Sequence, residues 1–138
     1  MLEIDPHFDP AIWPLGMAYI GKRQFDDAVR VLAPHAHDAA ASPETLPALG
    51  VALALRGDRT GATEIITELE RRSASGYFPA GLIGMVYLAL GATDRAFALF
   101  SQALDERSLF ASWLNAWPLI EPHRKDKRFA DFRQRLGL

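Results

Sequence analysis

Residues 46–53 read Leu-Pro-Ala-Leu-Gly-Val-Ala-Leu, and nine positions further on the chain reaches Ala62. The glycine of this stretch and that alanine each recur 34 residues earlier and 34 residues later. The recurring small residues are Gly16, Gly50 and Gly84 in one set, and Ala28, Ala62 and Ala96 in the other. A fixed period of this length, present three times, is typical of a chain built from stacked structural repeats.

Apolar residues around the small residues repeat with the same period. In the first copy, Ile12, Leu15 and Tyr19 are three and four positions apart, so they share one face of a helix. Their equivalents are Leu46, Leu49 and Leu53 in the second copy, and Ala80, Ile83 and Tyr87 in the third. Short segments with glycine or polar residues follow at 21–24, 56–59 and 91–93. Such segments favour tight turns between antiparallel helices, so each unit is predicted to be a helix pair.

The repeated glycines lie in the middle of a predicted helix, where glycine costs about 1 kcal/mol relative to alanine. Because a glycine stands at the same position of all three copies despite this cost, a close helix crossing is predicted at Gly16, Gly50 and Gly84. Ala28, Ala62 and Ala96 are expected to supply the facing surface of the second helix. Both sets are interpreted as packing residues of the repeat, without a catalytic role.

The spacing resembles the W-x2-L-G-x2-Y…A-x3-F pattern of the tetratricopeptide family over residues 9–110. The resemblance implies an all-α fold, an α-α superhelix or solenoid of helix-turn-helix repeats. The three repeats are expected at 9–42, 43–76 and 77–110. Residues 1–8 are interpreted as the remnant of a preceding repeat or a lead-in segment. Residues 111–138 fall out of the period and are predicted to form C-terminal capping helices, the last of which carries Phe129 and Phe132 on its inner side.

The C-terminal stretch has a second, narrower resemblance. It rests on Asp105-Glu-Arg-Ser108, Pro118-Leu119, the run from Pro122 to Phe129, and Arg135-Leu-Gly-Leu138. These segments are similar to the C-terminus of large bacterial regulators, in which tetratricopeptide repeats follow a winged-helix, adenylate cyclase or serine/threonine kinase domain. The similarity implies that the chain is the C-terminal interaction part of such a protein, or a relative of it.

The nearly balanced charge of the chain does not favour binding to nucleic acid or to an anionic membrane. The 138 residues hold 15 basic and 17 acidic side chains and no cysteine. No apolar run approaches the length of a membrane span, and Met1–Pro6 lacks the basic and apolar regions of a signal peptide. The basic stretch at 124–128 contains Asp126 and lacks interleaved aromatics, so it is interpreted as a solvated helix face. A cytoplasmic protein that binds neither nucleic acid nor membrane is expected.

Catalytic or metal-binding patterns do not emerge from the sequence. His35 and His37 are two positions apart, so on a helix they point about 200° apart and cannot chelate one ion together. No nucleophile with a paired base and no phosphate-binding loop is recognisable. The chain is therefore predicted not to be an enzyme and to hold no metal or cofactor. The remaining alternative is a metal-dependent or hydrolytic enzyme on a helical scaffold.

The family resemblance implies that the first helix of each pair lines a concave groove. The residues expected there are Trp13, Met17, Ile20, Val51, Ala54, Phe78, Met85 and Leu88. They are apolar, whereas repeats that hold the carboxylate tails of chaperones place lysine, arginine and asparagine in the groove. The predicted function is a protein–protein interaction scaffold whose partner is an amphipathic helix or an extended apolar segment.

Three alternatives stay open for these apolar surfaces. Several of the groove residues can pack between neighbouring first helices. Residues 109–120, with Trp113 and Trp117, can fold back over the groove. The chain can also be a homo-oligomerisation module, for example a homodimer that pairs through its N-terminal end. That end is expected to expose Phe8, Trp13, Phe25 and Val29, unless Leu2 and Ile4 fold over and cap it.

Overall fold

The computed structural model describes residues 12–36, 44–76, 80–105, 123 and 125–135. Within them the chain is all-α, with seven α-helices, one short 3-10 helix and no strand, which confirms the predicted class. The helices are α1 (Ile12–Gly21), α2 (Phe25–Leu32), the 3-10 helix η1 (Ala33–His35), α3 (Thr45–Arg56), α4 (Arg59–Ser75), α5 (Ala80–Ala89), α6 (Thr93–Asp105) and α8 (Lys127–Arg135). The predictions for residues 1–8 and for a helix near 109–117 lie outside the described residues.

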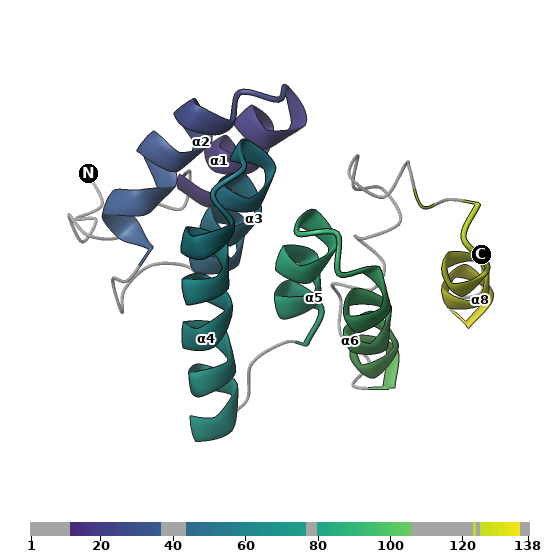
Figure 1. Cartoon of the computed structure of the whole chain (residues 1–138). Helices are drawn as coiled ribbons and strands as arrows, with labels where there is room; N and C mark the ends of the chain where they lie inside the picture. The colour runs from purple at the N-terminus through teal and green to yellow at the C-terminus, as the bar shows by residue number, and fades with distance from the viewer. Residues whose placement is uncertain (1–11, 37–43, 77–79, 106–122, 124, 136–138) are drawn as a thin grey trace, which may run out of the picture.

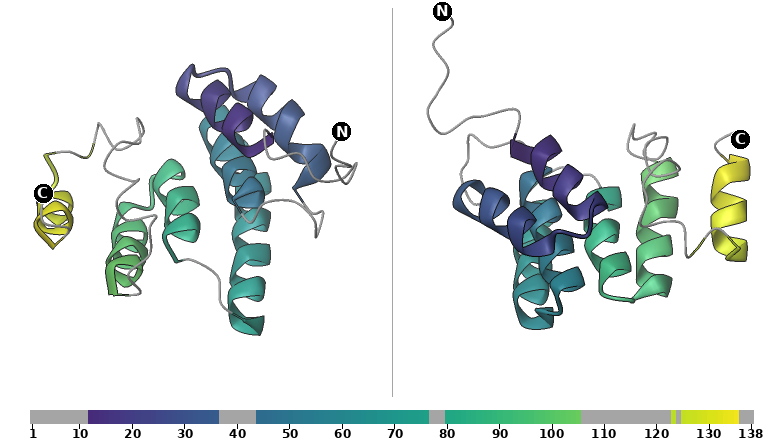
Figure 2. Two further views of the ribbon diagram at one scale, coloured as in Figure 1. Left: turned by 180° about the vertical axis from the view of Figure 1, so that it is seen from behind. Right: turned by 90° about the horizontal axis from the view of Figure 1, so that it is seen from above.

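The helices pack as consecutive pairs, α1 with α2, α3 with α4, and α5 with α6. Each pair also contacts the next one, because α1 and α2 both reach α3, and α3 and α4 both reach α5. Finally α8 packs on α6. Figure 1 shows the pairs following one another from α1 and α2 to α8, and Figure 2 shows the same order from behind and from above. The predicted helix pairs are confirmed.

The turns inside the three pairs have one hydrogen-bond pattern. The backbone N–H groups of Gln24, Asp58 and Ala92 donate to the carbonyl oxygens of Tyr19, Leu53 and Tyr87, in each case at 2.9 Å. The preceding residues are Arg23, Gly57 and Gly91, with positive φ angles of 61°, 98° and 84°. This pattern closes a helix with a left-handed residue and pairs its last carbonyl groups. The 34-residue period of the sequence is therefore also a period of the backbone.

Arg23 occupies a left-handed position that its two equivalents fill with glycine. Arg23→Gly is expected to stabilise the fold, because the left-handed conformation costs an L-residue about 1–2 kcal/mol. Part of this gain is lost to the greater unfolded-state entropy of glycine, so the free energy of unfolding should rise by about 0.5–1 kcal/mol. Urea denaturation measures the change. Gly57→Arg is the reverse control and should lower stability. Equal stability of wild type and Arg23→Gly would contradict the left-handed turn.

The period extends beyond the third pair. The second helices α2, α4 and α6 begin at residues 25, 59 and 93, and α8 begins at residue 127, one further period along. The backbone N–H of Ala130 donates to the Asp126 carbonyl at 3.1 Å, as that of Ala96 does to Ala92 at 3.0 Å. Helix α8 therefore begins in step with the 34-residue period, although the sequence was expected to leave that period after residue 110. It buries a different face, however, because Phe129 and Phe132 are buried where their equivalents Arg95 and Ala98 on α6 are exposed, and Ala130 is exposed where Ala96 is buried.

The repeated glycines lie where neighbouring side chains leave no space for a Cβ atom. A Cβ atom built on Gly16 would stand 2.5 Å from a methyl group of Leu32, and one on Gly84 would stand 2.7 Å from the Phe100 ring. The Gly84 position is also 3.2 Å from the carbonyl oxygen of Ala96. Such distances leave no room for a side chain. The alanines of the second set, Ala28, Ala62 and Ala96, are all fully buried.

One continuous apolar cluster joins the three pairs to α8. Phe129 and Phe132 of α8 are buried in it, and the Phe132 ring lies 6.3 Å from that of Phe100 on α6. Among the described helices, none combines the length and the apolar character needed to cross a membrane.

Candidate functional site

An open groove lies between α6 and α8. Its volume is about 620 Å³, and its apolar part is formed by Phe97, Ala98 and Phe132. The polar part consists of Asp94 and Ser101 on α6, and of Arg128, Asp131, Gln134 and Arg135 on α8. Phe97 and Phe132 are almost fully buried, whereas Ala98 is exposed on the α6 side. The groove therefore has an aromatic floor below a charged rim.

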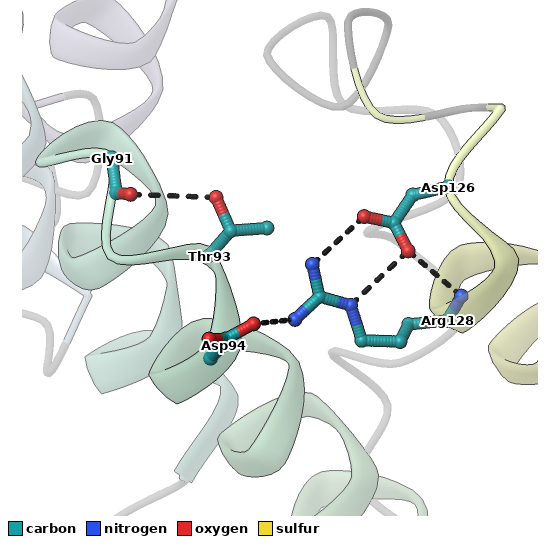
Figure 3. Close-up of polar contacts among 5 residues, drawn as sticks. All are labelled: Gly91, Thr93, Asp94, Asp126 and Arg128. Atoms are coloured by element: carbon teal, nitrogen blue, oxygen red, sulfur yellow. Dashed lines mark hydrogen bonds and ion pairs between the residues drawn. The ribbon is translucent and has the colours of Figure 1, made fainter.

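Arg128 connects the two sides of the groove. Its Nε and backbone N–H donate to Asp126 Oδ1 at 3.1 and 2.8 Å, and its Nη2 donates to Asp126 Oδ2 at 2.9 Å. Its Nη1 donates to the carboxylate of Asp94 at the start of α6. Figure 3 shows the guanidinium group between the two carboxylates. The same group stacks over the Phe97 ring, with its central carbon 5.0 Å from the ring centroid.

These contacts stabilise the ionised forms of Asp126 and Arg128 at this end of the groove. The hydrogen bonds from the Arg128 side chain, and then the one from its backbone, lower the pKa of Asp126 from an ordinary 3.8 to about 2. The same pair raises the pKa of Arg128 above its usual range. Both groups therefore stay ionised across the physiological pH range, and Arg128 acts as a clamp between α8 and α6.

Exposed basic side chains lie on α8 and just before it. They are Lys125, Lys127, Arg133 and Arg135, whereas Arg128 of the same stretch is half-buried and bonded to Asp126 and Asp94. Residues 125–135 hold five Lys or Arg side chains and two Asp, and Asp126 is bound by Arg128. At the far end of the groove, Arg135 Nη1 donates to Ser101 Oγ at 2.6 Å. The groove therefore lies along a helix with an excess of positive charge.

A second polar cluster joins α4, α5 and α6. The Tyr87 hydroxyl on α5 donates to Glu70 Oε1 on α4 at 2.6 Å, and the Arg95 guanidinium lies 5.7 Å from the Tyr87 ring centroid. Burial, and then the hydrogen bond with Glu70, raise the pKa of Tyr87. The cluster keeps the phenol protonated, and it links consecutive pairs at the surface.

The residues predicted to line a concave groove take different positions. Ile20, Val51, Met85 and Leu88 are buried in the core, with at most 5% of their surface exposed. Trp13, Met17 and Ala54 are half-buried and pack against that core, and Phe78 lies outside the described residues. The reason is that α1 contacts α3 and α3 contacts α5, so side chains on these faces fill the space between first helices. The four buried residues are therefore core residues and do not line an open surface.

Within the described residues, the histidines do not gather into a cluster that could bind a metal ion. His35 is half-buried in η1, and the His123 ring lies 6.4 Å from the Phe97 ring in an edge-on arrangement. His7 and His37 lie outside the described residues. Nowhere in the described part do three His, Cys, Asp or Glu side chains gather as they would around a metal ion.

The α6–α8 groove was not found by sequence reasoning. Its polar contacts join residues one period apart, Asp94 with Arg128 and Ser101 with Arg135. The 34-residue offset between the start of α6 and the start of α8 is the signal that would have placed these residues opposite each other. Comparisons of this chain with protein-family models, with curated proteins and with solved structures found no match.

Proposed function

We propose that this chain is a protein-interaction scaffold of the tetratricopeptide type, in which the helix pairs stack as a solenoid. Three observations support it: the common 34-residue spacing of α2, α4, α6 and α8, the identical turns, and the packing of each pair on the next. The proposal assigns the chain no catalytic role. From the C-terminal resemblance, it also makes the chain a part or a relative of a bacterial multidomain regulator.

The proposed binding surface is the α6–α8 groove, and the proposed partner is an acidic amphipathic segment of another protein. The observation that carries this proposal is the aromatic floor of Phe97 and Phe132 next to α8, a helix whose charged side chains are mostly basic. An amphipathic helix buries its apolar face in such a groove and turns its polar residues to the rim. The rim itself holds Arg128 and Arg135 together with Asp94 and Asp131, and the exposed Lys127 and Arg133 of α8 lie outside this lining. The net positive charge of α8 would attract an acidic segment and repel a basic one.

The experiment uses two labelled helical peptides that share one apolar face and carry either glutamate or lysine on the polar face. Fluorescence anisotropy with the full chain should show binding of the acidic peptide, and this binding should weaken as salt is raised. Ala98→Trp should fill the groove, because Ala98 is exposed on its α6 side, and should weaken binding at least tenfold.

The matched control is Ala74→Trp, which places the same side chain at an exposed position of α4. It should bind the acidic peptide as the wild type does. Equal binding of the acidic and basic peptides would overturn the proposed partner chemistry. Unchanged affinity in Ala98→Trp would remove the groove as the binding surface.

A further inference from the structure

Helix α1 has an apolar side that the described helices leave uncovered. Its ten residues include no charged side chain, yet only Gly16 and Ile20 are buried. The exposed residues are Pro14, Leu15, Ala18 and the terminal Gly21, and Leu15 exposes 43% of its surface. A helix that is apolar on all sides is normally enclosed by other elements. The other first helices α3 and α5 follow this rule, because most of their residues are buried.

The same side is covered in both later pairs. Pro14, Leu15 and Ala18 correspond by the 34-residue period to Ala48, Leu49 and Ala52 on α3, and to Leu82, Ile83 and Val86 on α5. All six equivalents are buried, with between 0% and 6% of their surface exposed. The preceding pair packs on each of these helices, α1 and α2 on α3, and α3 and α4 on α5. The uncovered side of α1 is thus the side on which this fold receives a further helix.

The contact between α5 and α3 shows how closely that side is approached. A Cβ atom built on Gly50 of α3 would stand 3.0 Å from both γ-carbons of Val86. Ala18 is the equivalent of Val86 on α1, and it is exposed. Its small side chain would let a helix backbone come equally near.

We propose that a second copy of this chain covers this side, with α1 packed against α1 of the partner about a two-fold axis. In such a contact each side chain near the axis meets its own copy, so a charge there would be repelled by itself. The segment from Ile12 to Gly21 contains no charge, and the nearest charge on this side is Lys22, one turn from Ala18 at the end of the helix. Leu15 supplies apolar surface, and Ala18 and Gly21 leave room for the partner helix. The proposal is independent of the α6–α8 groove, which lies at the other end of the row of helices (Figure 1).

The dimer is expected to be weak. A helix of ten residues is about 15 Å long, and stable interfaces usually bury about 800 Å² on each partner. One helix face provides less than this area. The dissociation constant should therefore be in the micromolar range or weaker, and the oligomeric state should depend on protein concentration.

Sedimentation equilibrium of the full chain from low micromolar to millimolar concentration tests the proposal. The wild-type mass should rise from that of a monomer toward that of a dimer. Leu15→Glu should stay monomeric throughout with unchanged helical circular dichroism. Ala74→Glu, which adds the same charge at an exposed position of α4, should behave as the wild type.

A second measurement identifies the occupant. The chain has no cysteine, so Ala18→Cys introduces a single thiol. We place the two-fold axis at residue 18, the exposed small residue of α1, so the contact would bring the two thiols within disulfide distance, with Cα atoms about 4.4–6.8 Å apart. Mild oxidation should then give a covalent dimer much faster than in Ala74→Cys. A wild type that stays monomeric, or equal cross-linking rates in the two variants, would overturn the proposal, since another occupant would then cover α1.

Discussion

Replacing Phe100 with alanine is expected to lower the free energy of unfolding by about 3–5 kcal/mol, the usual range for a buried aromatic side chain. Phe100 is fully buried on α6. Its ring touches the position of Gly84 on α5 and lies edge-on to Phe97, with ring centroids 5.6 Å apart. It also contacts Phe132 on α8. The truncation would therefore leave a cavity where three helices meet, and urea denaturation would measure the loss.

Two further variants make the result interpretable. Phe100→Leu keeps part of the buried volume and should be destabilised less than Phe100→Ala, which gives a readout even if the alanine variant fails to fold. Glu64→Ala, at an exposed position of α4, should change stability by less than about 0.5 kcal/mol. Equal midpoints for Phe100→Ala and Glu64→Ala would show that Phe100 does not occupy the junction of α5, α6 and α8.

The helix pairs were predictable because their signals are local. Gly57 and Gly91 mark the two turns with a left-handed residue, and the period then locates the first turn at Arg23 although no glycine stands there. The repeated glycines indicate close packing by their residue type alone, because a glycine inside a helix lowers its stability and is expected only where a larger side chain would not fit. These features depend on neighbours along the chain, which a sequence pattern can show.

The groove and the burial of first-helix residues depend on packing between distant segments. Val51 and Met85 lie on helices without a polar face, so the pattern cannot tell which side meets a neighbouring helix. The register of α8 was missed for a related reason. Ala130 preserves the alanine of the period, but Pro118 stands at the position that Gly84 marks one period earlier. Because one of the two markers is lost after residue 110, the sequence pattern indicates the end of the repeat there.

Gly50→Val is expected to destabilise the fold by about 1–3 kcal/mol or more through overpacking. A Cβ atom at this position would lie 2.9 Å from Ile65 Cγ2 on α4 and 3.0 Å from the γ-carbons of Val86 on α5. Neither neighbour has free space, because Ile65 is 5% exposed and Val86 is fully buried. The added side chain would therefore push the α3–α4 pair and α5 apart. Chemical denaturation followed by circular dichroism measures the effect.

The cause of this loss can be separated from a general effect of valine in a helix. At Gly21 an added Cβ atom meets nothing within 4 Å, so Gly21→Val should leave stability nearly unchanged. Combining Gly50→Val with Val86→Ala should restore part of the lost stability relative to the sum of the single changes, because the smaller residue makes room for the new side chain. Strict additivity of the two substitutions would show that residue 50 and residue 86 do not touch. The crossing of α3 with α5, on which the stacking of the second and third pairs rests, would then be misplaced.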